Sequence, residues 1–200
     1  MKMLEVKNLA KAYDKEIVFE NLNIIFKKNE VNFIKGISGI GKTTLLRIIL
    51  GLDHDHHGEV CGFEELSKAC VFQEDRLLDE YSVYLNLSLF MPAKDRKAID
   101  EALDKIDLKD IGLKKVKELS GGQKRRIAIL RALLADKDLL VFDEPLKGLD
   151  QSSKDRLMAY LLSKIANKTV IWVSHDQSDD AYFKTVNMID LDKSTDMCNL

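Results

Sequence analysis

The sequence lacks the features of a secreted or membrane-spanning chain. Its three cysteines, Cys61, Cys70 and Cys198, are odd in number and no two form a C-x-x-C pair, which favours a reducing compartment over a disulfide framework. No apolar run reaches the length of about 18 residues that a spanning helix needs. Residues 1–14 have no apolar core, so we expect no signal peptide there. If the protein works at a membrane, we expect another chain to cross it.

A strong excess of one charge is also missing. The 31 lysines and arginines face 33 aspartates and glutamates, which gives a formal net charge of −2. A nearly balanced chain has no electrostatic case for binding nucleic acid, so we expect no nucleic-acid partner. The basic run at 124–126 adjoins the helically spaced Ile127, Leu130 and Leu134, and we predict that it forms the solvated face of an amphipathic helix. The histidine-rich segment 54–57 is interpreted as a solvated loop and not as a metal site.

Proline is scarce, but short runs of apolar and β-branched residues are frequent. Helical patterns lie between several of these runs. Buried strands that alternate with helices predict an α/β fold with a mostly parallel core sheet. The runs occupy residues 4–9, 31–35, 69–72, 139–143, 169–174 and 186–191.

Two parts of the chain depart from this alternation. The opening section 4–26 has the pattern of a hairpin and is predicted to form a separate antiparallel β piece. Residues 76–118 carry no strand pattern, so we predict a helical subdomain that extends to 119–123. We expect residues 1–200 to form one domain. Ser153 is a candidate cap for the helical pattern that starts there.

Residues 36–43 form a glycine-rich phosphate-binding loop. They match G-x-x-x-x-G-K-[ST], and they lie between a predicted strand and a predicted helix, as that motif requires. Glycines let backbone N–H groups surround an anion, and the helix N-terminus adds the positive end of its dipole. Lys42 can reach the β- and γ-phosphates, and the Thr43 hydroxyl can ligate Mg²⁺. The predicted nucleotide-binding residues are Gly36, Ser38, Gly39, Gly41, Lys42, Thr43 and Thr44.

Two carboxylates end the apolar run 139–143. Asp143 fits the Mg²⁺-linked carboxylate of a nucleotide hydrolase. Glu144 is the natural general base to polarise an attacking water molecule. Two carboxylates at a strand end are ordinary by themselves, but a metal-bound triphosphate needs them at this edge of the sheet.

Residues 119–123 read Leu-Ser-Gly-Gly-Gln, and with the phosphate loop and the acidic strand end they make the chain resemble the ATP-binding-cassette (ABC) ATPases over essentially its whole length. This resemblance implies a P-loop NTPase fold, ATP and Mg²⁺ as ligands, and a second cassette as partner. It also implies that Ser120, Gly121, Gly122 and Gln123 contact the ATP held by that partner. Ser120 and Gln123 have, in addition, the spacing of a capping box, which explains these two residues but not the two glycines.

Four further positions match the family one by one. The resemblance implies that Tyr13 stacks on adenine and that Gln73 contacts Mg²⁺ or the attacking water and senses the permease. It places Asp150 at the dimer interface and His175 against the γ-phosphate, so that Glu144, His175 and Gln73 form the catalytic set. Each position has a structural alternative: an edge aromatic, a polar strand end, a helix cap and a structural histidine, respectively.

The family resemblance implies that the chain is the ATPase subunit of a membrane transporter and lies on the cytoplasmic face of the membrane. The implied partners are a separate permease and, for an importer, a solute-binding protein. Residues 69–87 are similar to importers of the nitrate/sulfonate/taurine type. Residues 146–150 resemble the family's loop that crosses the dimer interface. Within them, Lys147 and Gly148 stand where the family more often has small residues such as Ser-Ala. The alternatives are a small exporter cassette for peptides or drugs and a non-transport ABC ATPase. A small-molecule kinase with a phosphate loop would lack residues 119–123 and the switch histidine.

Overall fold

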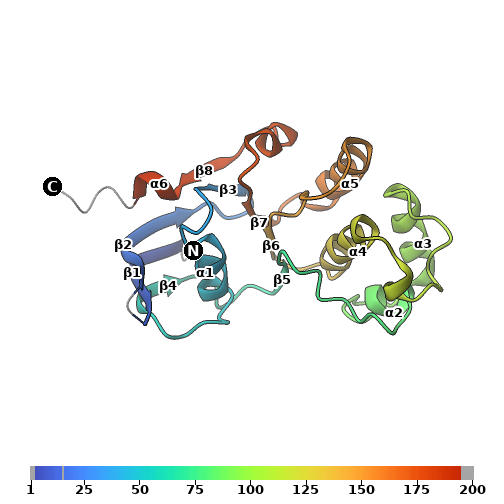
Figure 1. Cartoon of the computed structure of the whole chain (residues 1–200), viewed down its shortest axis with the longest axis horizontal. Coiled ribbons are helices and arrows are strands. Elements are labelled where there is room, and N and C mark those ends of the chain that lie inside the picture. The colour runs from blue at the N-terminus through green and yellow to red at the C-terminus, as the bar shows by residue number, and fades with distance from the viewer. Residues whose placement is uncertain (1–2, 15, 195–200) are drawn as a thin grey trace.

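The structure is a computed structural model that describes residues 3–14 and 16–194 (Figure 1). Cys198 lies outside these residues. The central sheet has five strands, all paired in parallel, in the order β5-β6-β7-β3-β8. This confirms the predicted parallel core. Its strands are β3 (Val31–Lys35), β5 (Lys68–Val71), β6 (Leu139–Asp143), β7 (Thr169–Val173) and β8 (Asn187–Asp190).

A smaller antiparallel sheet stands beside the parallel one, as predicted for the opening section. Strand β1 (Leu4–Tyr13) lies between β2 (Glu16–Phe26) and β4 (His57–Cys61). The sequence does not predict β4, because few of its residues are apolar, and pairing with β1 makes it a strand. His57, predicted to lie in a solvated loop, is therefore the first residue of a strand, although its side chain is exposed.

Helices supply the rest of the fold. Residues 76–118, all of which the structure describes, contain helices and one isolated bridge between Ser82 and Lys115. No helix within 3–14 and 16–194 is long and apolar enough to cross a membrane. The helices are α1 (Lys42–Ile49), α2 (Val83–Ser88), α3 (Arg96–Lys105), η1 (Val116–Glu118), α4 (Gly121–Leu134), α5 (Gln151–Lys164), η2 (Gln177–Tyr182) and α6 (Leu191–Ser194).

Helix α5 begins earlier than the sequence predicts. Its cap is Asp150, whose side chain accepts a hydrogen bond from the backbone N–H of Ser153 at 3.0 Å. The predicted Ser153 cap was wrong, because Ser153 already lies in the first turn. The alternative role of Asp150 as a helix cap is thereby confirmed.

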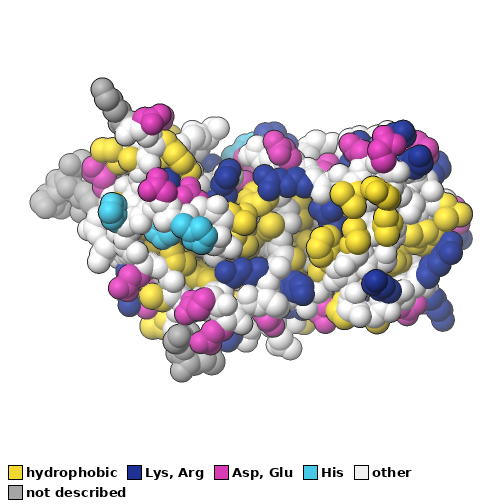
Figure 2. All heavy atoms as spheres, turned by 90° about the horizontal axis from the view of Figure 1, so that it is seen from below, with side chains coloured by type: hydrophobic (Ala, Val, Ile, Leu, Met, Phe, Trp, Pro, Cys, Tyr) yellow, Lys and Arg dark blue, Asp and Glu magenta, His cyan; other side chains and the backbone are white. Residues whose placement is uncertain are grey.

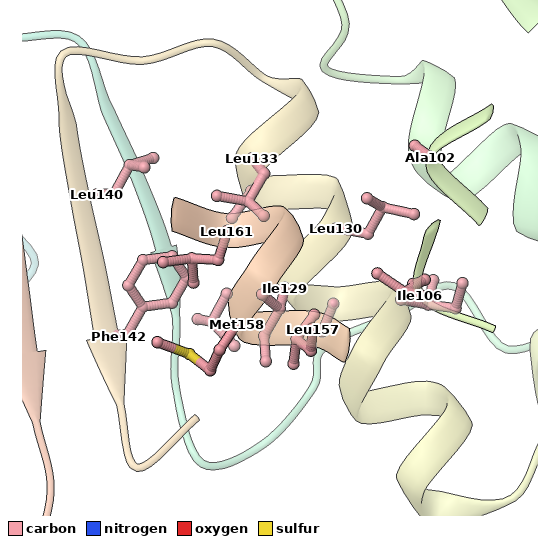
Figure 3. Close-up of a cluster of buried hydrophobic side chains, with 14 of the residues drawn as sticks. Ala102, Ile106, Ile129, Leu130, Leu133, Leu140, Phe142, Leu157, Met158 and Leu161 are labelled. Carbon is pink, nitrogen blue, oxygen red and sulfur yellow. The ribbon is translucent and has the colours of Figure 1, made fainter. Parts of the chain in front are cut away.

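Two clusters of buried side chains cover the two faces of the parallel sheet. On one face, α1 packs Leu45 and Leu46 between the two sheets. On the other, α4 and α5 pack against β6 and α3 (Figure 3). Successive residues Val141 and Phe142 of β6 belong to opposite clusters, as the strand period of two requires. Full burial of such side chains is worth about 1.5–3 kcal/mol each, so β6 is held firmly from both sides.

Candidate nucleotide-binding and hydrolysis site

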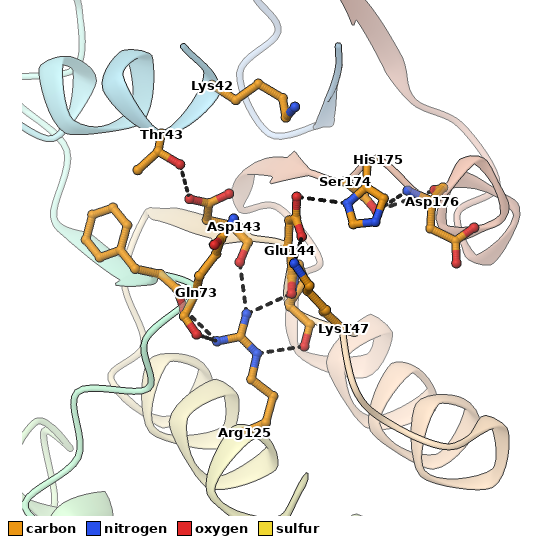
Figure 4. A network of polar contacts seen from close by, with 12 residues as sticks. Lys42, Thr43, Gln73, Arg125, Asp143, Glu144, Lys147, Ser174, His175 and Asp176 are labelled. Carbon is orange, nitrogen blue, oxygen red and sulfur yellow. Dashed lines mark hydrogen bonds and ion pairs between the residues drawn. The ribbon is translucent and has the colours of Figure 1, made fainter. Parts of the chain in front are cut away.

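The loops that follow β3, β5, β6 and β7 meet at one edge of the parallel sheet. Parallel strands place their carboxyl ends on the same side, where open α/β sheets bind ligands. The phosphate loop follows β3, Gln73 follows β5, Asp143 and Glu144 end β6, and His175 follows β7. Figure 4 shows these side chains around a common space between α1 and α4. The sequence-predicted catalytic residues are therefore neighbours.

The phosphate loop has the backbone that only glycine accepts easily. Gly41 is the N-cap of α1, with a left-handed φ of 99°. A Cβ there would lie 2.4 Å from Val18 Cγ1 and 2.7 Å from Phe19 Cζ. Lys42 is buried, and its ammonium donates to the carbonyl oxygens of Gly36 and Ile37, each at 2.7 Å. The loop thus closes around the lysine, and no side chain caps α1.

Thr43 and Asp143 join α1 to β6. The Thr43 hydroxyl donates to Asp143 Oδ2 at 2.6 Å, and Asp143 is only 1% exposed. Burial raises the pKa of the Asp143 carboxyl above its ordinary value, and the charge of Glu144 adds to this, although the Thr43 hydrogen bond opposes it. A hydroxyl and a carboxylate oxygen side by side are the hard oxygen ligands that Mg²⁺ prefers. These residues fit the predicted metal.

The Glu144 carboxylate is held by two neighbouring side chains, His175 and Lys147. Its Oε1 lies 2.8 Å from His175 Nδ1, and its Oε2 lies 3.2 Å from Lys147 Nζ, at ion-pair distance but without hydrogen-bond geometry. Burial favours a higher pKa for Glu144, but the contacts with His175 and Lys147 outweigh it and lower the pKa. Its backbone φ of 49° lies in the left-handed region that non-glycine residues rarely adopt, which is typical of a functional position.

The glycine-rich helix start at 120–123 faces the same space. Ser120 caps α4 by accepting from the backbone N–H of Gln123 at 3.3 Å, and Gln123 Oε1 accepts from the Ser120 N–H at 3.0 Å. The predicted capping box is confirmed. Gly121 and Gly122 line a cavity of about 340 Å³ together with Gln73 and Glu144. One space therefore joins residues 119–123 (the signature segment), residues 72–76 around Gln73 (the glutamine loop) and the candidate base.

Arg125 contradicts the prediction of a solvated basic face. It is only 6% exposed, and its guanidinium donates to backbone carbonyl groups on two loops (Figure 4). Lys124 and Arg126 are half-buried. The amphipathic interpretation was wrong because α4 is covered on nearly all sides. The sequence contains a sign of this burial, because residues 127–130 are all apolar and one full turn of the helix therefore has no polar side chain.

Tyr13 lies at the end of β1, on the antiparallel sheet. It is 45% exposed, and its hydroxyl donates to Asp53 at 2.8 Å. Lys11 Nζ lies 4.4 Å from the centre of the ring, at cation–π distance. The ring is thus fixed in orientation and still accessible to a ligand.

Comparison with known proteins agrees with this geometry. The family model for ABC transporters matches residues 19–147. The aliphatic sulfonates import ATP-binding protein SsuB of Bacillus cereus is 34% identical, over 90% of this chain and 77% of SsuB. The Fe(3+) ions import ATP-binding protein FbpC of Vibrio cholerae is 32% identical, over 87% of this chain and 54% of FbpC. This chain therefore spans about half the length of the FbpC-type relatives.

A solved structure is also similar over nearly the whole chain. It is the dimeric ATP-binding cassette MJ0796 in a post-hydrolysis state, bound to ADP and Pi. Its TM-score is 0.78 at 28% sequence identity, and the match covers 94% of this chain and 96% of that one.

Proposed function

The chain belongs to the ABC transporter family, and we propose that it is an ATP-binding and ATP-hydrolysing subunit that drives transport through a separate permease. The observation that carries the proposal is the contact between the phosphate-loop residue Thr43 and Asp143 at the acidic end of β6. Beside it, Glu144 lines a cavity together with Gly121 and Gly122 at the glycine-rich start of α4. The likeness to a cassette bound to ADP and Pi supports ATP as the substrate.

Binding begins at the phosphate loop. The N–H groups of 36–43 and the N-terminus of α1 receive the phosphates, while Lys42 exchanges its two carbonyl partners for phosphate oxygens. Thr43, Asp143 and Gln73 would hold Mg²⁺, whose chemistry there, when bound, is to neutralise charge on the β- and γ-phosphate oxygens. Tyr13 offers its exposed ring to the adenine.

Hydrolysis depends on Glu144 as general base. Its lowered pKa keeps the carboxylate ionised and able to accept a proton from the attacking water. His175 holds one carboxylate oxygen of Glu144, and we propose that it also contacts the γ-phosphate of bound ATP. Lys42 and the loop N–H groups stabilise the charge that develops on the phosphoryl oxygens.

A second cassette completes the site. We propose that two cassettes close head to tail around two ATP molecules, so that Ser120, Gly121, Gly122 and Gln123 of one contact the γ-phosphate bound by the other. The neighbour MJ0796 is a dimer, which supports this assembly. Asp150, in the loop between β6 and α5, lies on the proposed interface. A second copy of this chain is the partner to test first.

Exposed apolar side chains around α2 offer a surface for the permease. Leu78, Tyr81, Leu85, Leu89 and Phe90 are each 37–56% exposed. Hydrophobic side chains gather over the helical end of the molecule in Figure 2. This surface follows Gln73 in the chain, so movement at the nucleotide can reach the permease through the glutamine loop.

The type of transporter is proposed from the relatives. SsuB, an importer subunit for aliphatic sulfonates, matches over most of its length, which supports an importer of the sulfonate type with a solute-binding protein. The protein then works at the cytoplasmic face of the membrane without crossing it. Co-purification of a membrane permease tests this assignment, whereas co-purification of ribosomes or DNA would contradict it.

The decisive variant for the chemistry is Glu144→Gln. The neutral amide cannot accept the proton. The variant is therefore expected to bind ATP with wild-type affinity and to hydrolyse it at least about 100-fold more slowly. Phosphate release measured beside a nucleotide-binding titration separates the two steps. Normal turnover by this variant would remove Glu144 from its assigned role.

A further inference from the structure

Arg125 joins three parts of the site through one buried guanidinium. From α4, Nη2 donates to the carbonyl oxygens of Asp143 at 2.9 Å and Glu144 at 2.8 Å, and Nε donates to Pro145 at 2.9 Å. Nη1 reaches the carbonyl groups of the glutamine loop. The guanidinium lies between the two loops in Figure 4.

The position of Arg125 follows from where the sheet stops. Pairing between β5 and β6 ends at Val71 and Phe142, and the two chains then separate. Carbonyl groups beyond that point have no partner in the ladder between these strands, and a buried carbonyl without a partner is costly. The planar guanidinium has five donors in a fixed fork, so it can satisfy both chains at once.

These hydrogen bonds also act on the backbone of Glu144. Its left-handed φ of 49° persists only where the surroundings hold it. Arg125 donates to the carbonyl groups of Glu144 and of the residues on either side of it, Asp143 and Pro145. The direction of the Glu144 side chain therefore depends on Arg125.

The glutamine loop is held by the same helix. Arg125 Nη1 lies 3.1 Å from Asp75 Oδ1, and Arg131 donates to the carbonyl groups of Asp75 at 3.2 Å and Arg76 at 3.0 Å. Because Ser120 is the N-cap of α4, these hydrogen bonds connect the segment 119–123 to the glutamine loop and to the end of β6.

We propose that Arg125 is a positioning residue that fixes Glu144 and the glutamine loop relative to the start of α4. The inference rests on the proposed function, since it assigns Arg125 a role in the hydrolysis by Glu144. Arg125 does not touch the reacting atoms, and its effect is on the orientation of Glu144 and on the coupling of Gln73 to it.

Arg125→Lys is the primary test. Lysine keeps the charge, but a single ammonium group cannot reach the carbonyl groups of both loops in the geometry of the fork. We expect kcat to fall about tenfold or more, while the dissociation constant of ATP changes less than about twofold. Lys124→Gln is the matched control. It removes a positive charge from the adjacent position of α4, where Lys124 pairs with Asp79, and should leave kcat within about twofold.

A double-mutant cycle separates positioning from general stability. In a Glu144→Gln background, Arg125→Lys should change the remaining hydrolysis by less than about twofold, because residues that act as a unit have non-additive effects. If Arg125→Lys reduces hydrolysis by the same factor in the wild-type and in the Glu144→Gln background, the proposal is overturned. Arg125→Gln is the second variant, and loss of folding in both Arg125 variants would assign the residue a purely structural role.

Hydrogen exchange tests the link independently of hydrolysis. Arg125→Lys should speed exchange of the amides in 72–76 and 143–147 together, by about tenfold, and Lys124→Gln should not. A change confined to α4 would overturn the proposal. If the wild-type protein lacks ATPase activity, the proposed function fails, and this exchange pattern still decides whether Arg125 holds the two loops together.

Discussion

Helices α1 and α4 both begin at a glycine-rich segment beside the candidate site, yet their first turns are completed differently. The N-cap of α1 is Gly41, which has a left-handed conformation, and no side chain caps this helix. The N-cap of α4 is Ser120, and the side chains of Ser120 and Gln123 close a capping box. One helix start leaves its N–H groups to a ligand, and the other has part of its hydrogen bonding satisfied by its own residues.

The difference indicates two ways of receiving an anion. The loop before α1 contains glycines at which an added Cβ would clash with neighbouring atoms, and it encloses a buried lysine. It is therefore suited to bind the phosphates of a nucleotide held by the same subunit. A Cβ on Gly121 would meet nothing within 4 Å, and one on Gly122 only Leu149 Cδ2 at 3.5 Å. The start of α4 is therefore open and preformed, which suits a phosphate presented by another subunit.

Gly41→Ala is expected to have the largest effect on this comparison. A Cβ at Gly41 clashes with Val18 and Phe19 and opposes the left-handed backbone. A cost of about 3 kcal/mol in the binding conformation lowers ATP affinity about 100-fold, as a titration with a fluorescent ATP analogue can measure. Gly122→Ala, at the other helix start, should keep the wild-type affinity of the single chain. Equal losses in both variants would contradict the assignment of separate roles.

The pH dependence of binding should also differ between the two helix starts. The raised pKa of Asp143, caused mainly by burial, means that it takes up a proton at higher pH than an ordinary aspartate. Because only the ionised form is a good Mg²⁺ ligand, the gain in ATP affinity from Mg²⁺ should shrink as pH falls, and should do so at a higher pH than for an ordinary aspartate. Asp143→Asn should remove the part of this dependence that comes from Asp143 and leave the part that comes from the phosphates of ATP. The capping box of α4 contains no titratable side chain, so the stability of that cap should be constant over the same range.

The smallest expected effect is that of Ser120→Ala. Loss of the cap should lower the free energy of unfolding by about 1 kcal/mol, measured by urea denaturation. ATP binding by the single chain should be unchanged, because α1 is intact. Ser120→Asn, which keeps a capping side chain, serves as the control. A fall in ATP affinity with Ser120→Ala would show that the two helix starts are not independent.

The parts predictable from sequence are those in which a local pattern determines the structure. Strands β3 and β6 have the predicted bounds, and the phosphate loop follows one strand and opens a helix as its motif requires. The capping box at Ser120 was equally local. These features depend on residues within a few positions of one another, so a single segment contains the information.

The parts that could not be predicted depend on neighbours far apart in the chain. Arg125 is buried because it faces carbonyl groups about 20 and 50 residues away. Strand β4 forms because β1 offers it an edge. Tertiary partners decide each of these outcomes.

The central claim is that the start of α4 acts on the ATP held by a second subunit. Light scattering of the Glu144→Gln variant, alone and combined with Ser120→Arg, tests it directly. The account predicts that Glu144→Gln forms a dimer with MgATP, and that the double variant binds ATP with unchanged affinity but stays monomeric. A double variant that dimerises as readily, or that loses ATP binding as a monomer, would contradict the account.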